Sequence, residues 1–145
     1  MAKESKKSKV VDLSEFFTTQ RMEEGVWFEP TVYGKSTGLE FKVIGADSDE
    51  AAVIMSDYAK DTQKIEEEDD PQEKNKKTRE LLATYSSKLV KDIRVIEGYE
   101  VKLNGDEVRY SKDLVYNFFY ESPRFAIEIL NFARRDSNFT ERKSH

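Results

Sequence analysis

Residues 101–125 read VKLNGDEVRYSKDLVYNFFYESPRF, and this stretch decides the fold class. Two short runs of alternating apolar and polar residues come first, with Asn104-Gly105 between them. Asparagine and glycine both tolerate the positive φ that a two-residue turn needs, so the pattern predicts a β-hairpin. A serine cap and apolar residues at helical spacing follow directly. Strand and helix signals stand side by side here, and the stretch predicts an α+β fold.

Two C-terminal helices are predicted after this hairpin. Ser111 can accept a hydrogen bond from a free amide of the first turn, and Pro123 suits the first position of a second helix, with Ser122 as its cap. Both helices carry apolar residues on one side. These residues are Leu114, Val115, Phe118 and Phe119 in the first helix, and Phe125, Ile129, Phe132 and Ala133 in the second.

The middle of the chain predicts an antiparallel helical pair. Ser48 or Asp47 caps a helix that runs to Ile65, and a second amphipathic helix runs to about Ile93. Between them, five consecutive acids precede a proline, so we expect a mobile acidic elbow at 66–77. The residues expected in the core include Ile54, Tyr58, Leu82, Leu89, Phe118, Ile129 and Phe132.

The N-terminal third predicts a first β-hairpin. Val26–Tyr33 is rich in β-branched and aromatic residues, and Pro30 places it at the edge of a sheet. The sequence GKSTG supplies the turn, and the alternation from Leu39 to Val43 predicts a half-buried strand with one polar face.

The chain is expected to form one domain between two unstructured ends. Residues 1–9 carry four lysines against one glutamate, so we expect a disordered basic arm over 1–10. A single α+β domain is expected over 11–139, including the elbow, and a frayed tail over 140–145. The domain begins with a short helix within residues 12–25. The apolar side of this short helix consists of Leu13, Phe16 and Phe17.

Composition excludes several kinds of activity. The chain has 145 residues, is 37% hydrophobic and 37% charged, and has a formal net charge of −5, which is not the balance of a nucleic-acid binder. It contains no cysteine, and its single histidine is the final residue, His145. Thiol catalysis, Ser-His-Asp catalysis and Cys- or His-based metal sites are therefore excluded. No apolar run reaches the ~18–20 residues that span a membrane. We expect no enzymatic activity, no cofactor and neither a nucleic-acid nor a membrane partner.

The aromatic residues at the start of the C-terminal helical unit exceed what one helix face can bury. Tyr116 and Tyr120 lie four residues apart and so share a side of the helix. Aromatic side chains at such a boundary often anchor a protein contact. The residues that we expect to bind a protein partner, or neighbouring copies of this chain, are Tyr116, Phe119, Tyr120 and Phe125.

The C-terminal part of the chain, ending in IEGYEVKLNGDEVRYSKDLVYNFFYESPRFAIEILNFARRDSNF, resembles the tail assembly chaperones of long-tailed (siphovirus-type) bacteriophages. In that family a short hairpin carries a turn glycine, an aromatic-serine pair opens a helix, a proline follows, and a last helix ends in a phenylalanine. The matching positions are Gly105, Tyr110-Ser111, Pro123 and Phe139. Tyr99 stands where the family pattern has a tryptophan, and neither the acidic elbow nor the lysine-rich arm belongs to that pattern.

The resemblance implies a non-enzymatic assembly factor. Such a factor binds the tape-measure protein and holds it in solution while the tail-tube protein polymerises around it. The resemblance further implies self-association, a location in the host cytoplasm and absence from the mature virion. The alternative is a structural virion component, such as a small tail or head–tail joining protein, which would be present in finished particles.

Overall fold

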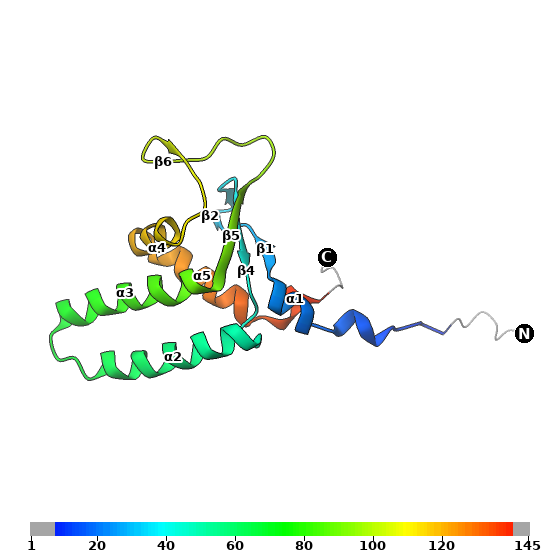
Figure 1. Cartoon of the computed structure of the whole chain (residues 1–145), viewed down its shortest axis with the longest axis horizontal. Helices are drawn as coiled ribbons and strands as arrows, with labels where there is room; N and C mark the ends of the chain where they lie inside the picture. The colour runs from blue at the N-terminus through cyan, green and yellow to red at the C-terminus, as the bar shows by residue number, and fades with distance from the viewer. Residues whose placement is uncertain (1–7, 141–145) are drawn as a thin grey trace, which may run out of the picture.

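The computed structural model describes residues 8–140, and it has the α+β fold that the sequence predicts. Its helices are α1 (Thr19–Glu24), α2 (Asp49–Glu66), α3 (Pro71–Leu89), α4 (Lys112–Glu121) and α5 (Pro123–Arg134), with the 3-10 helices η2 (Leu13–Phe16) and η3 (Asp136–Phe139). Its strands are β1 (Val26–Phe28), β2 (Thr31–Val32), β3 (Lys35–Ser36), β4 (Leu39–Val43), β5 (Val90–Val95), β6 (Lys102–Leu103) and β7 (Asp106–Glu107). Figure 1 shows α2 and α3 side by side on one flank and the N-terminal residues leading away on the other.

The predicted N-terminal hairpin is formed by β1 and β4. These strands are antiparallel, with Val26 opposite Val43 and Phe28 opposite Phe41. Side chains alternate along β4, so that every second residue from Leu39 is buried in the core. Two details of the prediction are wrong: the strand expected over Val26–Tyr33 ends at Phe28, and GKSTG is not the turn, because Lys35–Ser36 forms β3. The connection between β1 and β4 is longer than expected because it contains this smaller hairpin, β2–β3.

A third strand, β5, completes the main sheet, whose order is β1-β4-β5. The expectation of a helix to about Ile93 is wrong, because α3 ends at Leu89 and the chain continues as β5. β5 is antiparallel to β4 and places Ile93 opposite Phe41. The free edge of β4 explains the difference, since its backbone groups need partners and Val90–Val95 is rich in β-branched residues.

The predicted elbow at 66–77 is only partly a connection between helices. Asp70 accepts a hydrogen bond from the backbone N–H of Gln72 at 3.1 Å, and Pro71 takes the first position of α3. This is a strong helix start, because the cap satisfies one free amide and proline lacks another. Residues 71–77 are therefore helical, and the connection shortens to 67–70. The mobility expected of this connection stays a prediction.

The core lies between the helices and one face of the main sheet, and α3 contacts α2, α4 and α5. All seven residues predicted for the core belong to it or pack against it. The largest fully buried apolar side chains are Phe41, Phe119, Phe139, Ile44, Leu89 and Ile129.

The C-terminal unit follows the predicted order, with one correction. Asn104 and Gly105 adopt positive φ angles of 53° and 89° in the turn between β6 and β7. Ser111 accepts a hydrogen bond from the backbone N–H of Leu114 at 3.0 Å, as expected of a helix cap. Ser122 lies at the N-cap position of α5, but its side chain makes no capping bond. Its backbone N–H still closes the last turn of α4, because the two helices meet at this residue.

The helix expected within residues 12–25 is divided into η2 and α1. Phe17 has extended backbone between them, so the apolar side expected for this helix does not form. Leu13, Phe16 and Phe17 are exposed, and the residue of α1 that is buried is Met22. The arm predicted over 1–10 and the tail predicted over 140–145 fall mostly outside the described residues.

Candidate protein-binding surfaces

The four residues predicted to bind a partner do not form one surface. Phe119 is fully buried, and its ring centroid lies 5.5 Å from that of Phe41 and 5.8 Å from that of Phe118. The assignment of Phe119 to a binding surface is therefore wrong. Val115 and Phe119 lie four residues apart on one side of α4, and that side faces the core.

Phe125 lies at the edge of the core. Its ring stacks on Phe118 with the two centroids 5.0 Å apart, and Phe118 in turn stacks on Phe41 at 6.1 Å. Phe125 is half-buried, so contacts within the chain already use part of its ring. Its contact with a partner stays a prediction.

Tyr116 and Tyr120 form a half-buried pair on α4. Their rings stack with centroids 6.2 Å apart, as their spacing predicts. The guanidinium of Arg79, on α3, lies 4.4 Å from the ring centroid of Tyr120 and donates a hydrogen bond to the backbone carbonyl oxygen of Tyr120 at 2.9 Å. Tyr120 therefore ties α4 to α3, while part of the surface of both tyrosines stays open to solvent.

The α2–α3 groove is a shallow, open hollow of about 320 Å³ between these two helices. Leu81 and Tyr85 are buried and Ile65 is half-buried, so these three side chains form an apolar floor. The other side chains that line the groove are Asp61, Lys64, Lys77, Glu80 and Thr84. An apolar floor with a charged rim is the usual geometry for receiving an amphipathic helix.

Tyr85 links the two walls of the α2–α3 groove. Its hydroxyl donates a hydrogen bond to the carboxylate of Asp61 at 2.5 Å, and its ring meets the ring of Tyr58 edge-on, with the centroids 5.7 Å apart. The hydrogen bond to Asp61 raises the pKa of Tyr85 to about 12, and burial and the negative charges of Asp61 and Asp57 act in the same direction. Tyr85 therefore stays neutral, and stays bonded to α2, far into the alkaline range.

Tyr85→Phe is expected to reduce the loss of stability at alkaline pH. A tyrosine pKa near 12 in the folded chain, against ~10 in the unfolded chain, stabilises the fold fully below pH ~10 and progressively less as pH rises through 12. Urea unfolding measures the free energy of unfolding near pH 8 and near pH 11.5. The decrease in this free energy between the two pH values should be smaller in the variant than in the wild type. The pKa of Tyr110 is also raised, mainly by burial and then by the charge of Asp92. Tyr110 is present in both the wild type and Tyr85→Phe, so it does not contribute to the difference between them. An equal loss in both would contradict the prediction.

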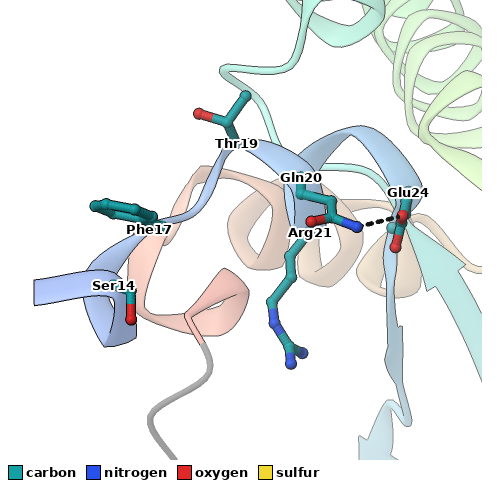
Figure 2. Close-up of a pocket in the computed structure, with 7 residues that line it drawn as sticks. Ser14, Phe17, Thr19, Gln20, Arg21 and Glu24 are labelled. Atoms are coloured by element: carbon teal, nitrogen blue, oxygen red, sulfur yellow. Dashed lines mark hydrogen bonds between the residues drawn. The ribbon is translucent and has the colours of Figure 1, made fainter. Parts of the chain in front are cut away.

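The N-terminal segment, defined as Val10–Phe17, exposes five large apolar side chains. These are Val10, Val11, Leu13, Phe16 and Phe17. Figure 2 shows Ser14 and Phe17 on one side of a hollow of about 580 Å³ and residues of α1 on the other, where Gln20 donates a hydrogen bond to Glu24 at 3.0 Å. Sequence reasoning missed this surface because it placed the apolar residues on a packed helix. The sequence signal that could have indicated this surface was the group of apolar residues directly after the lysine-rich arm.

Within residues 8–140, no group of three or more His, Cys, Asp or Glu side chains is placed to hold a metal ion. Over the same residues, no helix has the length and apolarity to cross a membrane. Comparisons of this chain with models of known protein families, with curated proteins and with solved structures find no match.

Proposed function

We propose that this chain is a non-enzymatic tail assembly chaperone of a long-tailed bacteriophage. It binds the tape-measure protein in the host cytoplasm and keeps it in solution until the tail-tube protein polymerises around it. The α2–α3 groove is the observation that carries this proposal. A long helical protein needs its apolar faces covered before assembly, and a groove with an apolar floor can cover them.

The ion pairs at the rim of the α2–α3 groove allow a partner helix to bind reversibly. The ammonium group of Lys64 lies 3.8 Å from Asp61, and that of Lys77 lies 3.3 Å from Glu68. Exposed ion pairs contribute at most about 1 kcal/mol each, so a partner helix can replace them with its own charges at little cost. Charges of both signs at the rim then orient the helix, while the floor supplies the apolar contact.

The residues that carry the sequence resemblance have structural roles in this chain. Gly105 forms the β6–β7 turn, Ser111 caps α4, Pro123 begins α5 and Phe139 is fully buried. The hydroxyl of Tyr110 donates a hydrogen bond to the carbonyl oxygen of Val90 at 3.3 Å. These roles are consistent with a fold shared with that family. The binding role is supported by the groove rather than by these residues.

Thr84→Arg is expected to block the α2–α3 groove. Thr84 lines the groove at the surface, so a long charged side chain there occupies the space of an incoming helix without entering the core. Capture of soluble tape-measure fragments by the tagged chain should fall at least about tenfold, which corresponds to ~1.4 kcal/mol. Ala59→Arg is the matched control, because it adds the same side chain to an exposed position of α2 outside the groove.

The proposal is contradicted by certain outcomes of this capture experiment and of two further measurements. Equal capture by Thr84→Arg and the wild type would exclude the groove. A third variant, Tyr120→Ala, is tested in the same way, and a loss of capture seen only in this variant would move the site to the Tyr116–Tyr120 pair. Longer tape-measure fragments that precipitate when alone provide a second test, because a wild-type chain that fails to keep them in solution would exclude chaperone activity. Finding the chain in purified particles would favour the structural virion component instead.

A further inference from the structure

The side of α3 that faces α4 carries a positive charge without a counter-ion. Arg79 is half-buried on this side, and within residues 8–140 its guanidinium forms no ion pair, although Glu80 and Glu121 adjoin Arg79 and Tyr120 in the sequence. A charge that is partly removed from water is usually accompanied by an opposite charge, because burial alone costs free energy. The fold therefore leaves one positive charge uncompensated here.

Contacts with α4 hold this guanidinium in one orientation. Its Nη2 atom donates the 2.9 Å hydrogen bond to the carbonyl oxygen of Tyr120, and its central carbon lies 4.4 Å from the centroid of the Tyr120 ring. Its Nε atom is buried and has no hydrogen-bond partner. Nη1 also lacks a partner within the described part of the chain, but this atom is not buried. Nη1 is therefore a fixed donor that a ligand can reach from solvent.

Two tyrosine hydroxyls of α4 are also without partners. The stacked rings of Tyr116 and Tyr120 lie nearly parallel, with 19° between their planes. Neither hydroxyl forms a hydrogen bond to another described residue, and neither oxygen is buried. The Nη1 atom of Arg79 and the two hydroxyls thus offer hydrogen-bond donors close to a positive charge. This environment fits a carboxylate, which carries one negative charge and accepts hydrogen bonds with both oxygens.

A carboxylate on a protein chain fits this place better than a phosphate or a nucleic acid. The whole chain has a net charge of −5, which repels a polyanion, whereas one carboxylate matches the single charge of Arg79. The half-buried rings of Tyr116 and Tyr120 also provide apolar surface for a neighbouring side chain. Lys76 lies one turn before Arg79 on the same side of α3, is exposed and forms no ion pair to another described residue, so it can meet a second acid.

We propose that Arg79, Tyr116 and Tyr120, which we name the Arg79 site, bind an acidic side chain of a protein partner. The carboxylate accepts hydrogen bonds from Nη1 of Arg79 and from a tyrosine hydroxyl, and an apolar residue beside it packs on the tyrosine rings. The Arg79 site is separate from the α2–α3 groove, because Arg79 lies two residues from Leu81, a rotation of about 200° around the helix axis. Figure 1 shows α4 and α2 on different sides of α3. The inference therefore does not rest on the proposed function.

Titration of the isotope-labelled chain with short peptides, followed by NMR, tests the Arg79 site. The probe is acetyl-Glu-Leu-Glu-Leu-amide, and its matched control, acetyl-Gln-Leu-Gln-Leu-amide, replaces the carboxylates by amides of similar shape. The signal of the Nε–H group of Arg79, which is shielded from solvent, reports binding and is assigned by its absence in Arg79→Gln. The dissociation constant should be at least about tenfold lower for the Glu peptide than for the Gln peptide.

Two results of this titration would overturn the proposal. Equal affinity for the Glu and Gln peptides would show that the Arg79 site does not recognise a carboxylate. Inorganic phosphate is titrated in the same way, and phosphate that binds as tightly as the Glu peptide would show that the site accepts any small anion.

Arg79→Gln is expected to raise the dissociation constant for the Glu peptide at least about tenfold, because it removes both the charge and the Nη1 donor. Arg135→Gln is the matched control. Arg135 is an exposed cation at the end of α5 that forms no ion pair within the described residues, so its loss changes the net charge by the same amount. This control should bind the Glu peptide like the wild type, and an equal loss of affinity in both variants would overturn the specific site.

If circular dichroism shows that Arg79→Gln is unfolded, Tyr116→Phe/Tyr120→Phe replaces it. This double variant keeps both rings and their packing but removes both hydroxyls. Its affinity for the Glu peptide should fall at least about threefold, because a hydrogen bond to the carboxylate is lost. Wild-type affinity for the Glu peptide in the double variant would overturn the proposal.

Discussion

Phe119→Ala is expected to lower the free energy of unfolding by about 3–5 kcal/mol. The ring is fully buried between β4 and α4, where it contacts Phe41 and Phe118. Its removal forfeits the burial of a large apolar side chain and leaves a cavity that the sheet and the helix cannot close, because both are held by other contacts. In a domain of this size the melting temperature should fall by roughly 10 °C.

Urea unfolding followed by circular dichroism measures the change for Phe119→Ala. Ile127→Ala is the matched control, because Ile127 is an exposed apolar residue on the neighbouring helix α5, and its loss should change stability by no more than about 0.5 kcal/mol. Wild-type stability in Phe119→Ala would mean that α4 turns another face to the core. Phe119 would then again be a candidate for contact with a partner.

Phe139→Ala is expected to have an effect of similar size, about 3–5 kcal/mol, although the residue lies near the end of the described chain. Phe139 is fully buried, and its ring meets Phe132 edge-on with the centroids 5.6 Å apart. Phe132 also stacks on Phe28 at 4.4 Å, so the three rings join η3, α5 and β1. Truncation of Phe139 therefore removes one buried ring and also weakens the packing of η3 and α5 against β1.

Phe17→Ala is the control for Phe139→Ala. It makes the same chemical change near the other end of the described chain, but Phe17 is 70% exposed and should contribute no more than about 0.5 kcal/mol to stability. Melting temperatures of the two variants, measured side by side, should differ by roughly 10 °C. Similar melting temperatures would show that η3 does not dock on the core.

Local features of the sequence could be interpreted correctly because their physical causes lie within a few residues. Asn104 and Gly105 predict a tight turn through their tolerance of positive φ, and they adopt it. Ser48 predicts a helix cap, and its hydroxyl accepts a hydrogen bond from the backbone N–H of Ala51 at 3.1 Å. The apolar spacing of α5 predicts its buried side in the same way, and Ile129 is fully buried there.

The candidate binding surfaces were only partly accessible to sequence reasoning. An excess of aromatic residues on α4 predicts that some of them lie at a boundary, and the pairing of Tyr116 with Tyr120 follows from their spacing. Which aromatic residue is buried depends on the rotation of α4 about its own axis, and packing against Phe41 and the other helices sets that rotation. Phe119 was misassigned for this reason. The α2–α3 groove joins side chains of two different helices, so no local sequence pattern predicts it.

The sequence by itself determined the fold class, the presence of two hairpins and of the four longer helices, and most of the core. Only the tertiary structure decided that residues 90–95 leave the helix to pair with β4, and that the apolar side chains of Val10–Phe17 stay exposed. The physical reason is the same in both cases. Helix and strand propensities differ by less than about 1 kcal/mol per residue, so tertiary packing, which offers a free strand edge in one case and leaves the apolar side exposed in the other, outweighs the local preference.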